Sequence, residues 1–468
     1  MSDTPLNLLD RPAGLAHGAA SPLPLFAVRP DGIETILPKT TASAPTQAKL
    51  NNFQGEAGRV LLLPDGQGNL AGAILGLGSA NTMTGFGAAA RALPAGTMWR
   101  IEAGDFDAQA AQLGFMLGAY KYQSQTSKQD HPAQIDQAAP TSIITAGSIM
   151  LARELINMPP NLLGPQELAT IIEAIANRFC ASIEKIKSEA LKKRFPALYA
   201  VGAGSAREPE AVVVRWKGSA ADESSPLISL CGKGVCFDTG GYNLKPGSAM
   251  RLMRKDMGGA AISLGLASAI MALDLRLRLE LRIGCVENSV SGHAMRPSDV
   301  LTTRSGLTVE VGDTDAEGRL VLCDLLHEAC EAMPDWLIDI ATLTGAARVA
   351  LGPDLPALFS NNDELADIIL AAGRDRHDPL WRLPLHESYK PWLSTAFADL
   401  CNISSKPFAG AITAALFLQH FITGSVAWAH IDTYAWNDAN RPGKPEGGEA
   451  QTLLALLTAI TALVRARS

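Results

Sequence analysis

Several features that would place a protein in a special class are missing from this chain of 468 residues. Its seven cysteines include no C-x-x-C pair and are odd in number, which argues against a disulfide framework and favours reduced, mostly buried thiols. No run of about 18 apolar residues occurs, so no membrane-spanning helix is expected. The start of the chain lacks the charged and then apolar regions of a secretory signal. We therefore expect a soluble, cytoplasmic protein.

The chain also has few charged residues, and its net charge argues against some classes of binding partner. Charged residues make up 19% of the chain and hydrophobic residues 47%, which is ordinary for a globular protein of two or three domains. The net charge of −7 offers no global basic surface for nucleic acid and no polybasic address for a membrane. Neither a G-x-S-x-G elbow nor a P-loop motif occurs, so the sequence does not support a serine hydrolase of that type or a P-loop nucleotidase.

The first 140 residues are predicted to form a smaller N-terminal α/β domain. They are rich in alanine and glycine and contain no constellation of charged residues that resembles a catalytic site. A helix near 142–157 must end at Met158-Pro-Pro160, because two prolines cannot continue it, so residues 141–164 are predicted to be a linker. Strand-like runs and helical patterns alternate before it, at 59–63, 73–77, 83–92 and 107–121.

Residues 165–468 are predicted to form the larger, catalytic α/β domain. Helical patterns alternate there with apolar strands, which favours a mostly parallel central sheet flanked by helices. Sites in such sheets form at the C-terminal ends of strands, and the candidate chemistry of this chain falls in those places. The predicted strands are 211–215, 227–230, 277–286, 336–340 and 426–431.

One acidic segment carries charge at every second position. It runs Val309-Glu-Val-Gly-Asp-Thr-Asp-Ala-Glu-Gly-Arg319, so Asp313, Asp315, Glu317 and Arg319 alternate with small or apolar residues. Alternate residues of an extended segment share one face. Carboxylates crowded on one face repel each other unless cations lie among them. The spacing therefore predicts a bound metal or a cluster of basic side chains.

A second acidic cluster lies in a glycine-rich stretch. Lys233, Asp238, Lys245 and Asp256 are embedded there among six glycines, which allow tight turns and a close approach to a ligand. A lone aspartate after a strand is more often a helix cap or a turn, but two such loops together favour a site. Carboxylates suit Mg²⁺, Mn²⁺ and Zn²⁺, and two metals about 3.5–4 Å apart can activate a bridging water. The glycines are 232, 234, 240, 241, 258 and 259.

Three other patterns are interpreted as structural. His327-Glu-Ala-Cys-Glu331 begins like the zinc motif H-E-x-x-H but ends in glutamate. Arg251, Arg254 and Lys255 could touch phosphate, although a solvated face accounts better for most of them. His430 follows an apolar strand and is interpreted as a core or supporting histidine. The helix of the first pattern has apolar positions that suit core packing, at 322, 325, 326, 329 and 333.

Taken together, the glycine-rich and acidic motifs resemble the leucyl (cytosol) aminopeptidase family of dinuclear metallopeptidases. The resemblance covers roughly residues 150–468, whereas the first 140 residues match only in size and placement. It rests on Lys233-Gly-Val-Cys-Phe-Asp-Thr-Gly-Gly241, Lys245-Pro246, Asp256-Met-Gly-Gly-Ala260 and Thr314-Asp-Ala-Glu-Gly-Arg-Leu320, and extends to Leu151–Asn157, Ser291–Pro297, Asp339–Gly345 and Ala409–Ala415.

The resemblance implies two divalent metal ions per subunit, Mn²⁺ or Zn²⁺. Lys233, Asp238, Asp256 and Glu317 match the ligands of the tighter metal, and Asp238, Asp315 and Glu317 those of the more exchangeable one. Asp238 and Glu317 are then the bridging ligands. Lys233 must lose its proton to coordinate, which is a large shift from the usual pKa of about 10.4.

The catalytic and substrate-binding residues follow from the same resemblance. Lys245 matches an electrophilic lysine near the substrate carbonyl, and Arg319 matches an arginine that holds a bicarbonate acting as general base. Met253, Thr342 and Leu343 match residues around the N-terminal side chain and backbone of a peptide. The implied enzyme removes N-terminal leucine or similar apolar residues from peptides and assembles as a homohexamer.

Two positions depart from the family pattern. Asp313 stands where members usually have asparagine, and Cys236 where they usually have threonine. An ionised Asp313 would add charge beside the metals, so it is expected to alter their binding from a supporting position.

Two alternatives stay open at this stage. Some relatives resemble DNA-binding regulators in a second role, against which the negative net charge argues. A different dinuclear hydrolase, such as a phosphoesterase, would also use lysine and arginine beside two metals.

Overall fold

The computed structural model describes residues 4–16, 21–123 and 131–467. The chain divides into two compact units, Met1–Leu151 with Asn437–Gly447, and Ala152–Trp436 with Gly448–Ser468. The division falls within helix α6 (Pro140–Asn157), the helix that the double proline was predicted to end. Over the described ranges, no helix is both long and apolar enough to cross a membrane.

The N-terminal unit is built on a five-stranded sheet in the order β2-β3-β1-β4-β5. Neighbouring strands are parallel except for β2 and β3. Asn81 and Asp107 cap helices α4 and α5, because each side chain accepts a hydrogen bond from a free N–H of the first turn. The elements are α1 (Thr4–Asp10), β1 (Leu23–Val28), α2 (Ile33–Ile36), α3 (Ala44–Leu50), β2 (Val60–Pro64), β3 (Leu70–Gly76), α4 (Thr82–Ala92), β4 (Met98–Ile101), α5 (Ala108–Ala119) and β5 (Gln134–Ile135).

The second unit contains an eight-stranded sheet in the order β14-β13-β16-β12-β8-β9-β7-β6. The four central strands β16, β12, β8 and β9 are all parallel to their neighbours within that group, and antiparallel pairs occur toward the two edges. The strands are β6 (Ser182–Lys187), β7 (Glu210–Lys217), β8 (Leu227–Asp238), β9 (Arg278–Asn288), β12 (Trp336–Ala341), β13 (Ala357–Ser360), β14 (Trp381–Arg382) and β16 (Ala427–Asp432).

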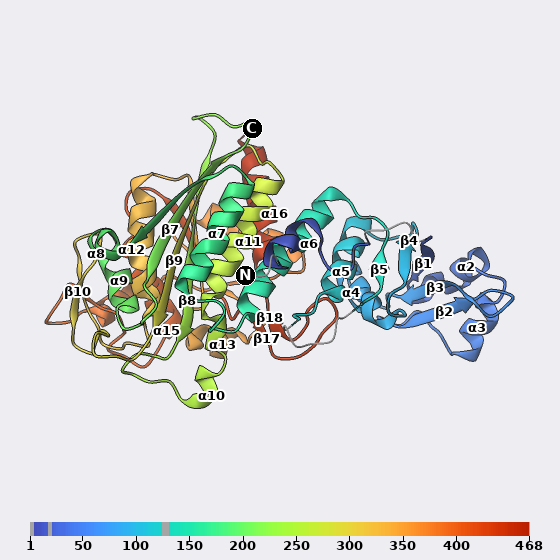
Figure 1. The fold of residues 1–468 in the computed structure, drawn as a ribbon, viewed down its shortest axis with the longest axis horizontal. Helices are drawn as coiled ribbons and strands as arrows, with labels where there is room; N and C mark the ends of the chain where they lie inside the picture. The colour runs from blue at the N-terminus through green and yellow to red at the C-terminus, as the bar shows by residue number, and fades with distance from the viewer. Residues whose placement is uncertain (1–3, 17–20, 124–130, 468) are drawn as a thin grey trace. The chain divides into compact units, whose positions relative to one another are not determined.

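Helices cover both faces of this sheet (Figure 1). Helices α7, α11, α14 and α16 lie on one face, and α9, α12 and α15 on the other. Their bounds are α7 (Pro165–Arg178), α9 (Pro196–Gly202), α11 (Gly258–Ala272), α12 (Gly318–Glu331), α14 (Asp363–Asp375), α15 (Gly410–Gln419) and α16 (Leu453–Ala466). Both predicted α/β domains, the larger with a mostly parallel central sheet, are confirmed.

Short elements connect these layers. A small sheet joins β10 (Val300–Thr302), β11 (Thr308–Glu310) and β15 (Leu400–Cys401), and β17 (Trp436–Asn437) pairs with β18 (Gly447–Gly448). The remaining helices are α8 (Ser188–Arg194), α10 (Gly247–Met250) and α13 (Gly345–Leu351), with 3₁₀ turns at Pro30–Gly32, Leu37–Lys39, Met253–Met257 and Glu387–Leu393.

Helix α11 lies unusually close to the sheet, and this fixes one side of the site. A Cβ on Gly259 would lie 2.0 Å from the carbonyl oxygen of Ile340 in β12, so only glycine permits this approach. Every residue of the helix from Gly258 to Met271 is buried. The turn that carries Asp256 is therefore held against the end of the sheet.

One part of the predicted core is wrong. Helix α12 ends at Glu331, and Met333 follows it with a positive φ of 48° and an exposed fraction of 81%. The helical period does not reach this residue, because the chain has already turned away. The other four predicted positions, 322, 325, 326 and 329, are buried.

Candidate functional site

The candidate site lies where the parallel strands end. Strand β8 ends at Asp238, β12 is followed directly by Thr342, and β16 ends at Asp432. Because these strands are parallel and adjacent, their C-terminal ends meet at one edge of the sheet. Asp256 arrives from the turn before α11, and Glu317 is the N-cap residue of α12. The two glycine-rich and acidic loops predicted from the sequence thus converge.

Three carboxylates form a group suited to a metal ion. Asp238, Asp315 and Glu317 each offer an oxygen, and these atoms lie within 4.8 Å of one another. Asp238 and Glu317 are buried, whereas the side chain of Asp315 is 32% exposed. One oxygen on each of Asp256, Asp315 and Glu317 is buried without a hydrogen bond of good geometry. These three oxygens face lysine ammonium groups instead, and carboxylate oxygens gathered in this way are ligands that divalent cations prefer.

Two lysines form ion pairs with the carboxylates, one at each end of the cluster. Lys233 Nζ lies 2.9 Å from Asp256 Oδ2 and 2.8 Å from Glu317 Oε1, and donates to the carbonyl of Thr342 at 2.9 Å. At the other end, Lys245 Nζ lies 2.8 Å from Asp238 Oδ2 and also contacts Asp315. All five sequence-predicted metal ligands and Lys245 therefore line a single cavity.

Burial and mutual repulsion disturb the ionisation of these groups. Burial, reinforced by the charge of Asp238, raises the pKa of Glu317 to about 8 and that of Asp315 to about 6. Burial by itself would lower the pKa of Lys233, but the charges of Asp256 and Glu317 outweigh it and raise that pKa. The cluster holds more negative charge than its two lysines balance easily, which favours additional cations.

Asp313 does not belong to the carboxylate group, contrary to the interpretation of one extended face. Residues 311–317 form a bent loop with a turn at 314–315 instead of a strand. Asp313 Oδ1 accepts a hydrogen bond of 2.8 Å from the N–H of Asp315. Its side chain therefore supports the loop, and its charge contributes to the raised pKa of Asp315.

Asn402 was not predicted from the sequence, yet it holds the same loop. Its Oδ1 accepts from the N–H groups of Gly312 and Asp313 at 2.7 and 3.2 Å, and its Nδ2 donates to the carbonyl of Asp313 at 2.7 Å. The carbonyl of Asn402 accepts from Arg319 Nη1 at 2.6 Å. Arg319 is 8% exposed, and its buried Nε has no acceptor, so this arginine keeps a donor for an anion.

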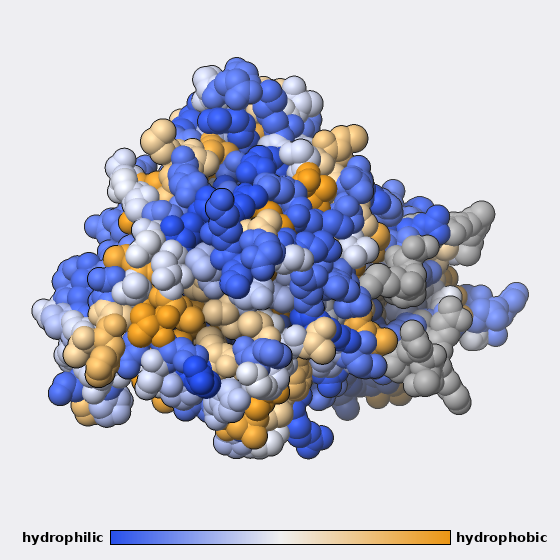
Figure 2. Space-filling view, turned by 60° about the vertical axis from the view of Figure 1, so that its left-hand side comes forward, coloured by the Kyte–Doolittle hydropathy of each residue, from blue (hydrophilic) through white to orange (hydrophobic). Residues whose placement is uncertain are grey.

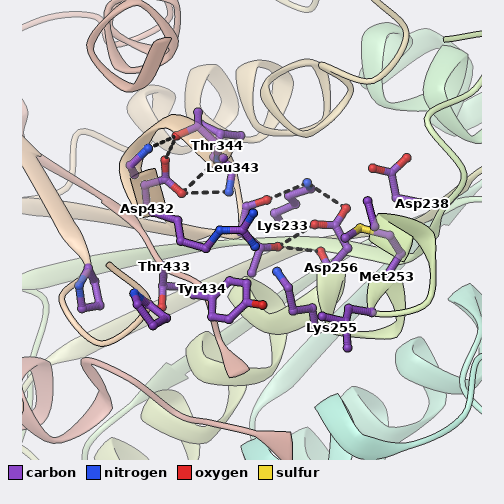
Figure 3. Close-up of a pocket in the computed structure, with 18 of the residues that line it drawn as sticks. Lys233, Asp238, Met253, Lys255, Asp256, Leu343, Thr344, Asp432, Thr433 and Tyr434 are labelled. Atoms are coloured by element: carbon purple, nitrogen blue, oxygen red, sulfur yellow. Dashed lines mark hydrogen bonds and ion pairs between the residues drawn. The ribbon is translucent and has the colours of Figure 1, made fainter. Parts of the chain in front are cut away.

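The cavity has a volume of about 480 Å³ and extends beyond the carboxylates. Met253, Thr342 and Leu343, the predicted substrate-binding residues, all line it. Figure 3 shows Met253 and Leu343 among the lining side chains. Thr342 Oγ1 donates to Asp256 Oδ1 at 2.8 Å, which fixes this wall to the metal cluster. Asp432 accepts from the N–H groups of Leu343 and Thr344 at 2.9 and 3.1 Å, and this holds the loop before α13.

Lys255 is the member of the basic group 251, 254 and 255 that does not lie on a solvated face. It is only 6% exposed, lines the cavity, and places Nζ 4.5 Å from the ring centre of Tyr434. Burial lowers its pKa to about 8. Arg348 of α13 lines the cavity as well, with its guanidinium carbon 4.9 Å from the same ring centre. Neither Tyr434 nor Arg348 was predicted, since the fold alone brings three distant segments together here.

His430 is buried in the core, in agreement with its interpretation. Its Nδ1 lies 2.6 Å from Asp339 Oδ1, and Trp428 Nε1 donates to the other oxygen of Asp339 at 2.7 Å.

Comparison with known proteins assigns the chain to a family. A model of the catalytic domain of the cytosol aminopeptidase family matches residues 150–457, which is more than half of the chain. The chain belongs to the cytosol aminopeptidase family. A model of the N-terminal domain of M17 aminopeptidases matches residues 23–136. The predicted family and the predicted class of enzyme, a hydrolase of peptide bonds, are confirmed.

Curated relatives and solved structures agree with this assignment. A probable cytosol aminopeptidase of Bradyrhizobium sp. is 40% identical over 358 residues, which cover 73% of this chain and 70% of the relative. A probable cytosol aminopeptidase of Caulobacter vibrioides is 42% identical over 68% of this chain, and the match spans 64% of that relative's length. The crystal structure of a cytosol aminopeptidase from Coxiella burnetii has a TM-score of 0.90 at 40% identity, with coverage of 95% of this chain and 98% of that one.

A second solved structure, at lower sequence identity, is also similar to this chain. The bottromycin maturation enzyme BotP in complex with Mn has a TM-score of 0.85 at 31% identity, and the match covers 95% of this chain and 100% of that one.

Proposed function

We propose that this protein is an aminopeptidase that hydrolyses the first peptide bond of peptides, with a preference for N-terminal leucine or similar apolar residues. The observation that carries the proposal is the group of Asp238, Asp315 and Glu317 at the wall of the cavity, whose carboxylate oxygens lie within 4.8 Å of one another. The names of the curated relatives support the same activity.

The proposed cofactors are two divalent ions, Mn²⁺ or Zn²⁺, held by Lys233, Asp238, Asp256, Asp315 and Glu317. The donor set of carboxylates and one amine suits these metals. BotP, a relative in fold and sequence, has been solved in complex with Mn. Two such ions supply Lewis acidity, which polarises a peptide carbonyl and makes a water molecule more acidic. Coordination by Lys233 requires that it give up its proton, so its present ion pairs must be exchanged for the metal.

The remaining charged residues take separate tasks in this proposal. Lys245, 13% exposed in its side chain, is placed to donate to a carbonyl oxygen as negative charge develops there. Arg319 holds a bicarbonate that serves as general base, and its buried Nε without an acceptor supports an anion at this position. Met253, Thr342 and Leu343 surround the side chain and backbone of the N-terminal residue.

We also propose that the protein assembles as a homohexamer in the cytoplasm, and that the N-terminal unit serves oligomerisation or regulation. The catalytic unit exposes several large apolar side chains, including Val349, Phe397 and Phe408 at 86%, 77% and 67%. Figure 2 shows apolar residues gathered in the lower part of one face, beside a mostly hydrophilic upper part. Light scattering coupled to gel filtration measures the mass, and a monomer would contradict the assembly.

The activity is tested with leucyl p-nitroanilide and a leucyl peptide. Purified protein loaded with Mn²⁺ or Zn²⁺ should release leucine, and a chelator or Asp315→Asn should abolish the release. Asp363→Asn is the matched control, because Asp363 begins α14, is 87% exposed in its side chain and does not line the cavity. Activity that survives both the chelator and Asp315→Asn would contradict the proposal.

A further inference from the structure

Two cations lie against one aromatic ring inside the cavity. Lys255 Nζ is 4.5 Å and the guanidinium carbon of Arg348 is 4.9 Å from the ring centre of Tyr434, and all three residues line the cavity. In Figure 3 the amine of Lys255 points toward the ring of Tyr434, below Asp256 and Met253. These contacts bring two positive charges close together in a space that already adjoins the carboxylate cluster.

The nearby carboxylates are engaged with other groups. Asp256 faces Lys233 and accepts from Thr342 Oγ1. Asp432 accepts from two backbone N–H groups and from the hydroxyl of Thr344. Throughout the described part of the chain, neither the ammonium of Lys255 nor the guanidinium of Arg348 has an ion pair or hydrogen bond with a carboxylate. A buried cation without such a partner is costly, so this place favours an anionic ligand group.

The position of the cations indicates which part of a peptide they would meet. Lys245 contacts Asp238 and Asp315 at one end of the cluster, whereas Lys255 directly precedes Asp256 at the other end. If Lys245 faces the carbonyl of the scissile bond, as proposed above, the α-amine and side chain of the N-terminal residue lie toward Asp256, Met253 and Lys255. The cations therefore face the first side chain of the substrate.

We propose that Lys255 and Arg348 make the pocket for the N-terminal side chain accept carboxylates, so that N-terminal glutamate and aspartate are released faster than glutamine and asparagine. This inference rests on the proposed aminopeptidase function. The remaining lining includes Pro353, Leu355 and Pro356, which can pack against the methylene groups of an acidic side chain while its carboxylate reaches the cations. Such a pocket combines an apolar wall with a charged end.

The test uses the full-length, metal-loaded protein and pairs of peptides that differ only in charge. We expect kcat/KM for Glu-Ala-Ala to be about ten times that for freshly dissolved Gln-Ala-Ala. The same factor of about ten should separate Asp-Ala-Ala from Asn-Ala-Ala. Lys255→Met should lower this ratio about 30-fold, because it removes the buried partner of the carboxylate. Arg348→Gln should lower it about threefold, because Arg348 is exposed and better screened by water.

Two controls separate the inference from general effects. Arg251→Gln removes an exposed cation two residues before Met253 that does not line the cavity, and it should leave the ratio unchanged. Arg348→Glu, at an exposed helical position, keeps the test usable if Lys255→Met fails to fold; it should lower the ratio and raise the relative rate for Lys-Ala-Ala.

A wild-type ratio of one or less would overturn the inference, as would a ratio that none of the Lys255 and Arg348 variants changes. A preference for charge in the second residue, measured as Leu-Glu-Ala against Leu-Gln-Ala, would also overturn it, because the cations would then face the leaving group. If the metal-loaded protein does not cleave Leu-Ala-Ala either, the proposed function itself has failed; cleavage of Leu-Ala-Ala without the acidic preference removes only this inference.

Discussion

Asp313 accepts a hydrogen bond of 2.8 Å from the backbone N–H of Asp315 through its Oδ1. This bond links a carboxylate outside the proposed metal site to one inside it. The same loop is held from the other side by Asn402, whose amide bonds to the N–H and the carbonyl of Asp313. The orientation of Asp315 thus depends on two residues that contribute no ligand atom to the carboxylate group.

This relationship predicts a graded effect on metal affinity. Asp313→Asn keeps an oxygen that can accept from Asp315 and removes only the charge, so it should weaken Mn²⁺ binding modestly. Asp313→Ala removes both and should weaken it about 10- to 100-fold. Titration calorimetry of the metal-free protein measures both affinities without reference to activity. Equal affinities for the two variants would show that the hydrogen bond is unimportant.

Much of the site could be predicted because its residues lie where a parallel sheet must place them. Asp238 ends a strand, and the glycines beside it and beside Asp256 are needed for close contacts such as that of Gly259 with Ile340, whereas Thr342 was predicted only from the family resemblance. A strand pattern and a glycine-rich loop are local signals, and a parallel sheet brings them to the same edge without further information.

The rest depended on contacts between distant segments. Lys255 looks like part of a solvated basic run, and it is buried because its turn, Met253–Met257, packs against β8 and α11. Asn402 and Tyr434 stand in sequences without a motif. The loop at 311–317 was misjudged because alternating charge resembles a strand, whereas the hydrogen bonds of Asn402 bend this segment. Asp432 could have been predicted as a site residue, because it is a polar residue at the C-terminal end of a strand.

Gly318 should be necessary for the position of Lys233. A Cβ at residue 318 would lie 2.6 Å from Cε and 2.8 Å from Nζ of Lys233, whose ammonium is already fixed by Asp256 and Glu317. Gly318→Ala should therefore lower metal affinity and activity at least about tenfold, while the fold is retained because alanine favours the helix by about 0.5–1 kcal/mol. Gly292→Ala, with no atom within 4 Å of the new Cβ, is the control. Unchanged metal affinity in Gly318→Ala would mean that Lys233 can move freely.

Arg282 should be important for stability. It is 1% exposed, its Nη1 donates to Ser229 Oγ at 2.7 Å, its Nη2 lies 2.7 Å from Glu280 Oε2, and its Nε contacts Glu328. Arg282→Met leaves these groups without their cation and should lower the free energy of unfolding by about 3–5 kcal/mol.

A matched arginine makes the Arg282 measurement specific. Arg215 reaches the same Glu280 at 3.2 Å but is 44% exposed in its side chain, so Arg215→Met should cost about 1 kcal/mol or less. Urea unfolding followed by tryptophan fluorescence compares the two variants. Equal losses would contradict the view that burial decides the contribution.

Asp324 should make stability depend on pH in the direction opposite to that of an ordinary ion-paired aspartate. It is fully buried and accepts from the N–H groups of Ala197, Leu198 and Arg304 at 2.8, 3.2 and 2.7 Å, yet burial raises its pKa to about 6. Because the folded pKa lies above the unfolded value near 3.8, the folded state binds the proton more tightly. The cost of the buried charge is then fully present above pH 6 and disappears as the pH falls toward 4. It amounts to something on the order of 3 kcal/mol.

The stability of the wild type should therefore rise, relative to that of Asp324→Asn, as the pH is lowered from 7 to 4. Asp222 gives the opposite sign at lower pH: hydrogen bonds from Ser224 lower its pKa below 3.8, so the wild type should lose stability relative to Asp222→Asn only as the pH falls below that value. Free energies of unfolding from urea titrations at several pH values test both slopes. If the plots of unfolding free energy against pH run parallel for wild type and Asp324→Asn, the prediction is wrong. The three N–H donors to Asp324 would then compensate fully for the burial of its charge.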